Sequence, residues 1–341
     1  MPNDSTCIPD IGYFGSPDFL ILSLHLTTAI CTPVYLLGLY CILYKTPEVM
    51  KSVKYHLLAL HFWAILLDYS LGVLGIPYMF FPEVAWISFG LLRYLGVSTA
   101  VQNILALGLI CFMATSIMAI YENRFFILRE FSWKHRWEVG RRFWHFAHYV
   151  LVVAMLIPVI FMIPDQETAL KQVMKTLPCL PDYLYKEEIF VLATDLRPLI
   201  LGAFLFIGLL VLETGFFIIC IGFNAMEQVR TMRMSEATFQ MQKRFFIALV
   251  IQTAIPFAML LIPLIILGYI VVFNYRNQAL VNIGTVYLAT HGFFATIVMI
   301  VVHRPYRVAV KGMIEKIWPG RRSRVVAVIE PMSTVMATVS K

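Results

Sequence analysis

Seven apolar stretches, each long enough to cross a bilayer as a helix, constrain the fold of this chain more than any other feature. A helix needs about 20 residues to cross roughly 30 Å of hydrocarbon. Alternation of apolar and polar residues, which marks the strands of membrane barrels, is absent. We therefore predict an all-α bundle of seven transmembrane helices. The predicted spans are residues 19–44, 55–81, 89–121, 143–163, 198–223, 245–273 and 281–302.

The composition agrees with a membrane protein. Hydrophobic residues make up 60% of the chain and charged residues 14%, against about 45–50% and about 25% in soluble domains. The seven spans leave short loops and a short tail, which is too little for a separate folded domain. We expect an outer segment (1–18), a transmembrane domain (19–303) and a cytoplasmic tail (304–341). In such a chain the net charge of +7 indicates residues that orient the spans in the lipid bilayer rather than bind nucleic acid.

The basic residues divide unevenly between the two sides of this bundle. One set of alternate connections, together with the tail, carries 21 Lys and Arg residues, and the other side carries six. Because cytoplasmic loops are enriched in Lys and Arg, this division places the N-terminus outside and the C-terminus inside. The inner connection between the fifth and sixth spans contains Arg230, Arg233, Lys243 and Arg244.

Two cysteines and one glycosylation sequon lie on the predicted outer side. Asn3 begins the sequon, and its position agrees with an outside N-terminus. Cys7 and Cys179 could form a disulfide in this oxidising environment, which would tether the N-terminus over the loop after the fourth span. Two free thiols are the alternative, because a disulfide requires Cα atoms within about 7 Å.

Three ionisable side chains lie deep within the predicted spans, where charged groups usually face the interior of the bundle. At 1.5 Å per residue, Asp68 lies about 20 Å from the inner end of the second span, and His291 about 15 Å from the outer end of the seventh. Both are near the midplane and could pair if these spans are neighbours; separate bonds to backbone, serine or water are the alternative. Glu213 lies nearer the cytoplasm, as a gating group or as a carboxyl bonded to a neighbouring helix.

No catalytic constellation is visible. The eight histidines are spread along the chain rather than clustered as in membrane metal enzymes. There is no nucleotide-binding glycine loop and no Gly-x-Ser-x-Gly motif. The seventh span has no lysine, which excludes a retinal Schiff base there. We therefore expect no enzymatic activity, no catalytic residues, no metal and no cofactor.

The inner ends of two spans carry charged or amphipathic patterns. Glu122 and Arg124 end the third span, where a breakable ion pair would favour a closed state. After the seventh span, residues 308–318 mix apolar and basic side chains. This pattern predicts a short amphipathic helix that lies on the inner leaflet.

Short motifs at the span ends narrow the class of protein. In chain order they are Ser16-Pro17-Asp18-Phe19-Leu20, Leu24-His25, Thr46-Pro47, Met50-Lys51, Leu60-His61-Phe62-Trp63, Ile76-Pro77-Tyr78, Glu122-Asn123-Arg124 and His303-Arg304-Pro305-Tyr306-Arg307. In this order and spacing they resemble the nematode serpentine chemoreceptors, most closely class H of the Str superfamily of seven-transmembrane G-protein-coupled receptors. The resemblance covers about Cys7 to Arg307.

The resemblance implies a chemosensory receptor in the plasma membrane, in the cilia of sensory neurons. A small-molecule ligand bound on the outer side would shift the bundle so that it engages a heterotrimeric G protein inside. The four basic residues between the fifth and sixth spans would border the G-protein face. Candidate pocket residues in the outer halves of the spans are Arg93, Gln102, Asn103 and Tyr287.

The resemblance also assigns roles to particular residues. Glu122 and Arg124 stand where rhodopsin-like receptors carry an Asp-Arg-Tyr switch, although one residue separates them here. Pro305 and Tyr306, followed by Arg307, stand roughly where those receptors carry Asn-Pro-x-x-Tyr. Asp68 resembles the acid of the second span that binds sodium in many such receptors. The residues of the seventh span that usually bind sodium with this acid are not matched here, so we expect no sodium.

A channel or transporter is the alternative class. Insect odorant receptors are seven-span channels, but their N-terminus lies inside, opposite to the orientation predicted here. Transporters often contain internal repeats with binding sites near the midplane, and no repeat is visible in this sequence.

Overall fold

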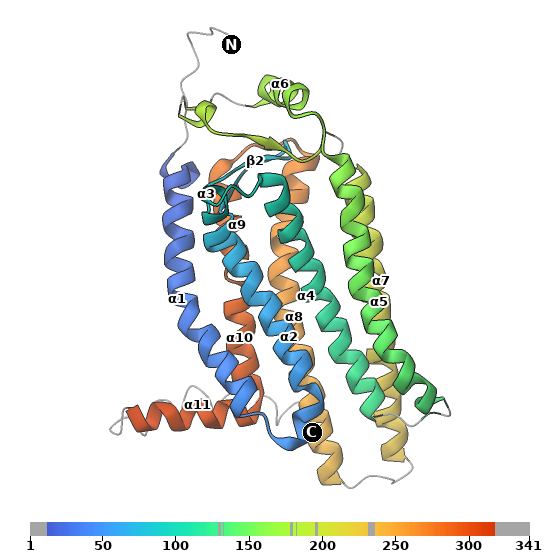
Figure 1. Cartoon of the computed structure of the whole chain (residues 1–341). Coiled ribbons are helices and arrows are strands. Elements are labelled where there is room, and N and C mark those ends of the chain that lie inside the picture. The colour runs from blue at the N-terminus through green and yellow to red at the C-terminus, as the bar shows by residue number, and fades with distance from the viewer. Residues whose placement is uncertain are drawn as a thin grey trace.

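The computed structural model is a bundle of long helices with a small sheet across one end (Figure 1). It describes residues 12–128, 131, 133–177, 180–181, 183–194, 197–230 and 236–317. Within these ranges seven helical segments are long and apolar enough to cross a membrane, as predicted. They are α1 Pro17–Tyr44, α2 Lys51–Tyr69 with the π-helical turn η3 Ser70–Leu74, α4 Thr99–Leu128, α5 Lys134–Met162, α7 Arg197–Arg230, α8 Glu236–Val272, and the pair α9 Gln278–Leu288 and α10 His291–Val302.

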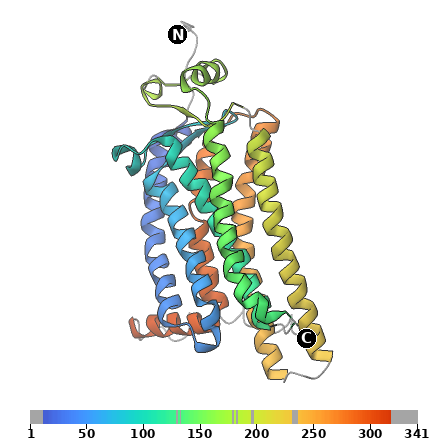
Figure 2. The same ribbon diagram turned by 45° about the vertical axis from the view of Figure 1, so that its right-hand side comes forward.

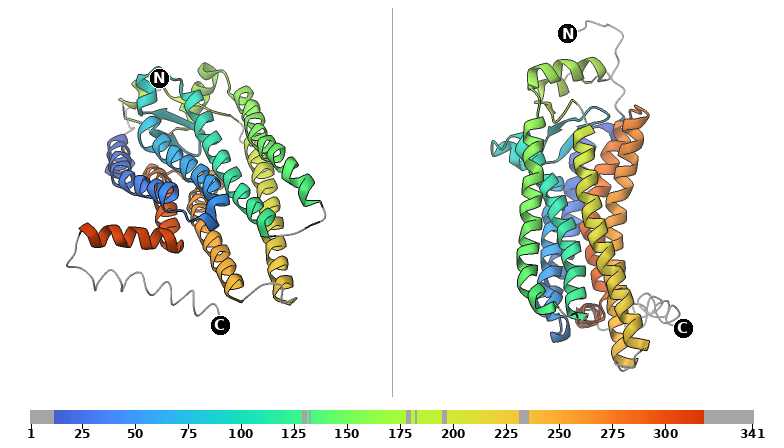
Figure 3. Two further views of the ribbon diagram at one scale, coloured as in Figure 1. Left: turned by 60° about the horizontal axis from the view of Figure 1, so that its bottom comes forward. Right: turned by 90° about the vertical axis from the view of Figure 1, so that its right-hand side faces the viewer.

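Helix α4 lies at the centre of the bundle because it packs against α2, α5 and α7. Helix α10 packs against α8, α1 and α2, so the seventh span lies beside the second (Figures 2 and 3). Side chains between the helices, such as Leu67 and Met113, are buried, whereas Leu36, Phe204 and Val272 are exposed on the outside of the bundle. Such an exposed apolar surface suits lipid rather than water.

Side-chain caps fix the outer ends of the first and seventh spans. Ser16 Oγ accepts the backbone N–H of Phe19 at 3.2 Å, and Pro17 occupies the first helical position of α1, where no donor is needed. Asn277 Oδ1 accepts the N–H of Leu280 at 3.0 Å at the start of α9. Both helices therefore begin at residues that satisfy the free donors of the first turn.

An antiparallel sheet covers the outer end of the bundle. Strand β1 Pro77–Phe80 pairs with β2 Ala85–Ser88, which pairs in turn with β3 Phe190–Val191. Helix α6 Gln166–Thr176 lies above this sheet in Figure 1. The outer side of the described bundle is thus covered by ordered backbone.

The sheet corrects two predicted span boundaries. The sequence prediction continued the second helix to residue 81 and began the third at residue 89, whereas the helices end at Leu74 and begin at Thr99. Pro77 has no N–H to donate and disfavours a helical conformation at Ile76, whose φ is 44°. The apolar run concealed this change because a short buried strand and a buried helix have similar hydrophobicity.

Other boundaries differ in length. The third span continues to Leu128, so Glu122 and Arg124 lie within the helix rather than at its end. The fourth begins at Lys134, nine residues before its predicted start at residue 143. The seventh is divided at Ala289 and Thr290 into α9 and α10, where a single helix was predicted.

The amphipathic helix after the seventh span is confirmed. Helix α11 Arg304–Ile317 begins four residues before the predicted start and extends sideways from the inner end of the bundle, past α1 (Figures 1 and 3). The short elements that complete the described chain are η1 Tyr13–Gly15, η2 Glu48–Met50, α3 Leu91–Tyr94 and η4 Leu184–Lys186.

Candidate functional site

A buried polar cluster joins the first, second and seventh spans near the middle of the membrane. His291 Nδ1 lies 2.5 Å from Asp68 Oδ1, which confirms the predicted pairing of these residues. Asp68 Oδ2 accepts the hydroxyl of Tyr35 and, at 3.0 Å, the backbone N–H of Gly292. Asp68 and His291 are 3% and 0% exposed, so this pair is shielded from water. We call these four residues the mid-membrane cluster.

The break in the seventh span explains why a carboxylate can bind there. Helix α10 begins at His291, so the N–H groups of its first turn have no partner within the helix. A carboxylate at a helix N-terminus satisfies such donors and the positive end of the helix dipole. Gly292 permits the close approach, because a Cβ on this residue would lie 2.5 Å from Asp68 Oδ2. Asp68 thus accepts one of the free donors at the break.

A histidine in α2 extends these contacts toward the inner side. His61 Nε2 lies 3.1 Å from the backbone oxygen of Tyr35, and His61 Nδ1 lies 3.4 Å from Thr296 Oγ1. Gly38 allows the helices to approach here, since an added Cβ would lie 2.5 Å from the methyl carbon of Thr296. The first, second and seventh spans are therefore joined at two successive levels.

In the inner half of the third span, Glu122 is fully buried and bonded to α5. Arg141 Nη2 donates to Oε2 at 2.6 Å, and Trp137 Nε1 donates to Oε1 at 2.8 Å. His145 Nε2 lies 3.0 Å from Oε2. These contacts attach the third span to the fourth.

The predicted ion pair between Glu122 and Arg124 is wrong, because Glu122 pairs with a different arginine. Glu122 pairs with Arg141 because residues two positions apart on a helix point in nearly opposite directions. Arg124 is buried and lies close to His303, which follows α10. Burial and this guanidinium lower the pKa of His303 to about 4, so its imidazole is neutral at pH 7.

Two polar contacts attach the sixth span to its neighbours at the same depth. Tyr121 Oη lies 2.6 Å from Thr253 Oγ1, which joins α4 to α8. His303 Nε2 lies 2.8 Å from Gln252 Oε1, which joins the end of α10 to α8. The Gln252 and Thr253 side chains are 4% and 7% exposed. We call these two bonds, Tyr121–Thr253 and His303–Gln252, the inner contacts.

The residues after the seventh span have defined structural partners. Tyr306 is fully buried, and its hydroxyl lies 2.8 Å from Thr46 Oγ1 at the inner end of the first span. Pro305 lies in the first turn of α11. Arg307 Nη1 donates to the backbone oxygen of Val301 at 2.6 Å and so satisfies an acceptor in the last turn of α10.

Glu213 has a partner in the neighbouring helix, one of the two arrangements expected from the sequence. His148 Nε2 lies 2.9 Å from Glu213 Oε2 and joins α5 to α7. A cavity of about 360 Å³ lies beside this pair and is lined by aromatic side chains that include Trp137, Trp144 and Phe217.

The predicted G-protein face is described in part. Lys243 and Arg244 lie near the inner end of α8, and Arg230 is the last residue of α7. Arg233 lies outside the described residues, as do Asn3, Cys7 and Cys179. The sequon and the disulfide therefore stay predictions.

Two of the candidate pocket residues have structural roles at the outer end. Arg93 Nη2 lies 2.5 Å from Glu187 Oε2, and Gln102 Oε1 accepts the hydroxyl of Ser88 at 2.6 Å. Asn103 and Tyr287 are partly exposed members of α4 and α9. None of these four residues lines the cavity of about 360 Å³ beside Glu213.

Sequence reasoning missed several residues of these networks. Polar residues within an apolar span signal interior contacts, and this signal could have found Gln252 and Thr253. A glycine directly after a midplane histidine could have indicated a close helix approach at Gly292. Tyr35 gave no such signal, because aromatic residues are common in spans, and Trp137 lies before the predicted start of the fourth span.

The bundle of seven helices, with a buried acid in the second span and a polar network at the inner end, defines the class of seven-transmembrane receptors. Residues 15–316 match the model of the family described as "Serpentine type 7TM GPCR chemoreceptor Srh". The chain therefore belongs to the Srh family of serpentine chemoreceptors.

Two known proteins are similar to this chain. Serpentine receptor class H-72 of Caenorhabditis elegans is 27% identical over 337 residues, which cover 98% of this chain and 95% of that protein. The crystal structure of squid rhodopsin aligns with a TM-score of 0.54 at 12% identity, over 91% of this chain and 87% of that one. The similarity to rhodopsin shows the fold alone.

Proposed function

We propose that this chain is a chemosensory receptor in which a small-molecule ligand shifts the helix bundle to a state that activates a heterotrimeric G protein. The proposal rests on the inner contacts. There, Tyr121 bonds to Thr253 of the sixth span. His303 bonds to Gln252 of the same span. A span attached by a few polar bonds can move without disruption of the apolar core.

The energies of these contacts suit a switch. A neutral hydrogen bond contributes about 1 kcal/mol net, so release of both contacts costs roughly 2 kcal/mol. A ligand that favours one state typically supplies coupling of about 1–3 kcal/mol. Movement of α8 away from α4 would open a groove for a helix of the G protein. Lys243 and Arg244 would border this groove, together with Arg230 at the end of α7 and Arg233 of the following connection.

The residues assigned to the switch would then act through their observed partners. Glu122 would hold the third span to the fourth through Arg141. Arg124 would stay beside His303, at the place where the sixth span moves. The Pro305–Arg307 segment would anchor α11 at the inner end of the first span through Tyr306. The mid-membrane cluster would carry the change from the outer half to this region through α10.

The receptor would act in the plasma membrane, with sensory cilia as the proposed location. The direct test is expression in a reporter cell line, with second messengers measured across a broad panel of chemicals. A ligand-dependent change that is lost in cells without the responding G protein supports the proposal. No response to any compound, with delivery to the cell surface confirmed by an N-terminal epitope, argues against it.

A further inference from the structure

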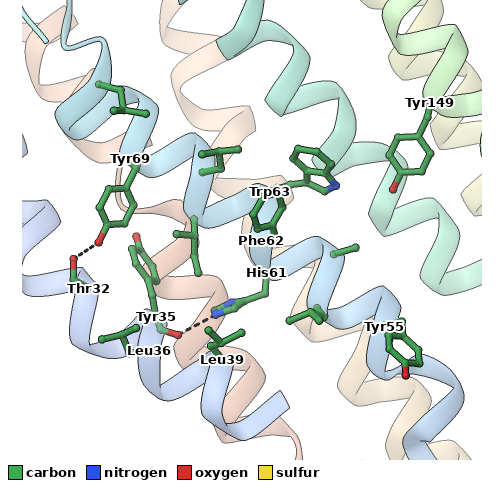
Figure 4. Close-up of a pocket in the computed structure, with 15 residues that line it drawn as sticks. Thr32, Tyr35, Leu36, Leu39, Tyr55, His61, Phe62, Trp63, Tyr69 and Tyr149 are labelled. Carbon is green, nitrogen blue, oxygen red and sulfur yellow. Dashed lines mark hydrogen bonds between the residues drawn. The ribbon is translucent and has the colours of Figure 1, made fainter. Parts of the chain in front are cut away.

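A long cavity runs along the membrane-facing side of the second span (Figure 4). Its volume is about 810 Å³, within the range of about 300–1,000 Å³ that is typical of small-molecule sites. It is lined from Tyr55 to Leu74, which are nineteen residues apart, so it follows α2 for about 28 Å. Leu36 of α1 and Tyr149 of α5 form its two sides. We call this cavity the lateral groove.

The lining of the lateral groove selects for a neutral, apolar occupant. None of its described lining residues is Asp, Glu, Lys or Arg. Phe62 and Trp63 contribute aromatic surface, and Trp63 stacks on Phe112 of α4 at a centroid distance of 4.8 Å. The polar atoms are few. Thr32 Oγ1 and Tyr69 Oη lie 2.6 Å apart (Figure 4). Because the Thr32 hydroxyl donates to the backbone oxygen of Thr28 at 2.7 Å, Tyr69 donates to Thr32, and the oxygens of this pair could accept one further bond from a hydroxyl.

The back wall of the groove is formed by residues that hold the mid-membrane cluster. Tyr35 lines the groove and donates its hydroxyl to Asp68. His61 also lines it and lies 3.1 Å from the backbone oxygen of Tyr35 (Figure 4). Its Nδ1 atom lies 3.4 Å from Thr296 Oγ1. An occupant that displaces the Tyr35 ring would therefore alter the contacts of Asp68 with the broken seventh span.

The outer route to the bundle is covered, whereas the lateral groove is open to the bilayer. Tyr78 of β1 donates its hydroxyl to the backbone oxygen of Gly15 at 2.7 Å. Glu83, in the β1–β2 turn, lies 2.5 Å from Arg276 at the start of the seventh span. Entry from the outer solution would have to break these contacts, and entry from the membrane would not.

We propose that the lateral groove binds a neutral, largely apolar small molecule with at most one hydroxyl, which reaches it from the bilayer. The inference rests on the proposed function, because it names the ligand class of the proposed receptor. It also changes the expected route of entry, from the outer solution to the membrane. A bound molecule would displace the Tyr35 side chain and so change the contacts of the mid-membrane cluster.

Photolabelling with diazirine derivatives of decanol and hexadecanol tests this inference. The full-length receptor is reconstituted in phosphatidylcholine nanodiscs, and labelled peptides are mapped by mass spectrometry with and without excess unlabelled alcohol. The Ala59→Trp variant fills the groove, and Leu36→Trp does so from a side chain that is 62% exposed and tolerant of substitution. Ala154→Trp, at an exposed position of α5, is the matched control.

We expect labelling of α1 and α2 that excess alcohol displaces. The displaceable fraction should be lost in Ala59→Trp and Leu36→Trp and kept in Ala154→Trp. If neither alcohol gives displaceable labelling, or if all three variants are labelled as the native chain is, the groove holds only bulk lipid and the inference is overturned. Nucleotide exchange is not measured, so this result is independent of whether the receptor activates a G protein.

Discussion

Replacement of Gly292 by alanine tests whether Asp68 holds the break in the seventh span. A Cβ at this position would lie 2.5 Å from Asp68 Oδ2 and 3.3 Å from its Cγ, well inside the usual contact distance of about 3.5–4.0 Å. The carboxylate must therefore move away from the N–H of residue 292, which it now accepts at 3.0 Å. The change acts on one contact of the mid-membrane cluster.

The magnitude follows from that contact. A hydrogen bond to a charged group contributes about 1.5–3 kcal/mol, and alanine regains up to about 1 kcal/mol of helix propensity over glycine. We expect Gly292→Ala to lower the free energy of unfolding by roughly 1–2 kcal/mol. Gly284→Ala is the matched control, because its Cβ would meet no atom within 4 Å, and it should be neutral or stabilising.

The assay is SDS-induced unfolding of purified protein, followed by tryptophan fluorescence, for the single variants and for a double variant with Asp68→Ala. Without the carboxylate, Gly292→Ala has nothing to displace, so its cost should disappear. An equal cost in both backgrounds would refute the reasoning, because the effect would then not act through Asp68.

Three further predictions concern the inner end. Tyr121→Phe removes the hydroxyl that meets Thr253, and the loss of about 1 kcal/mol should raise ligand-free nucleotide exchange roughly fivefold; an unchanged basal rate would exclude this contact as a restraint. Glu122→Ala leaves Arg141 without its buried partner, so the free energy of unfolding should fall by about 3 kcal/mol, measured by SDS titration; a loss under 1 kcal/mol would contradict the inferred pairing. The lowered pKa of His303 means that the fold favours its neutral form, so this stabilisation is present above its ordinary pKa of about 6.5 and lost as the pH falls toward about 4. The unfolding midpoint should drop over that window and change less in His303→Gln; equal profiles would count against a neutral buried imidazole.

The sequence predicted the number of spans and the helix after them, because hydropathy and amphipathicity are properties of long segments. It did not predict the outer sheet, because residues 77–88 are apolar enough to resemble the end of a helix. The prolines at positions 77 and 82 were the local signals of the change.

The sequence predicted contacts of the candidate site where two residues lie at the same depth in the membrane. A pairing of Asp68 and His291 could be proposed because both lie near the midplane, and the structure shows that their spans are neighbours. Glu122 and Arg124 are only two positions apart in sequence, but helix geometry directs them to different neighbours. The role of Gly292 depends on a backbone break that no proline marks, and Tyr35 reaches Asp68 from another helix. These contacts require the packed structure.

Guanine-nucleotide exchange on purified heterotrimeric G proteins tests the central claim most directly. The receptor is placed in nanodiscs, and exchange is compared between the native chain and a Tyr121→Phe, Gln252→Leu variant that lacks the inner contacts. The account predicts receptor-dependent exchange on at least one class of G protein, with a higher basal rate in the variant. Folded receptor that stimulates no class of G protein, in either form, would contradict it.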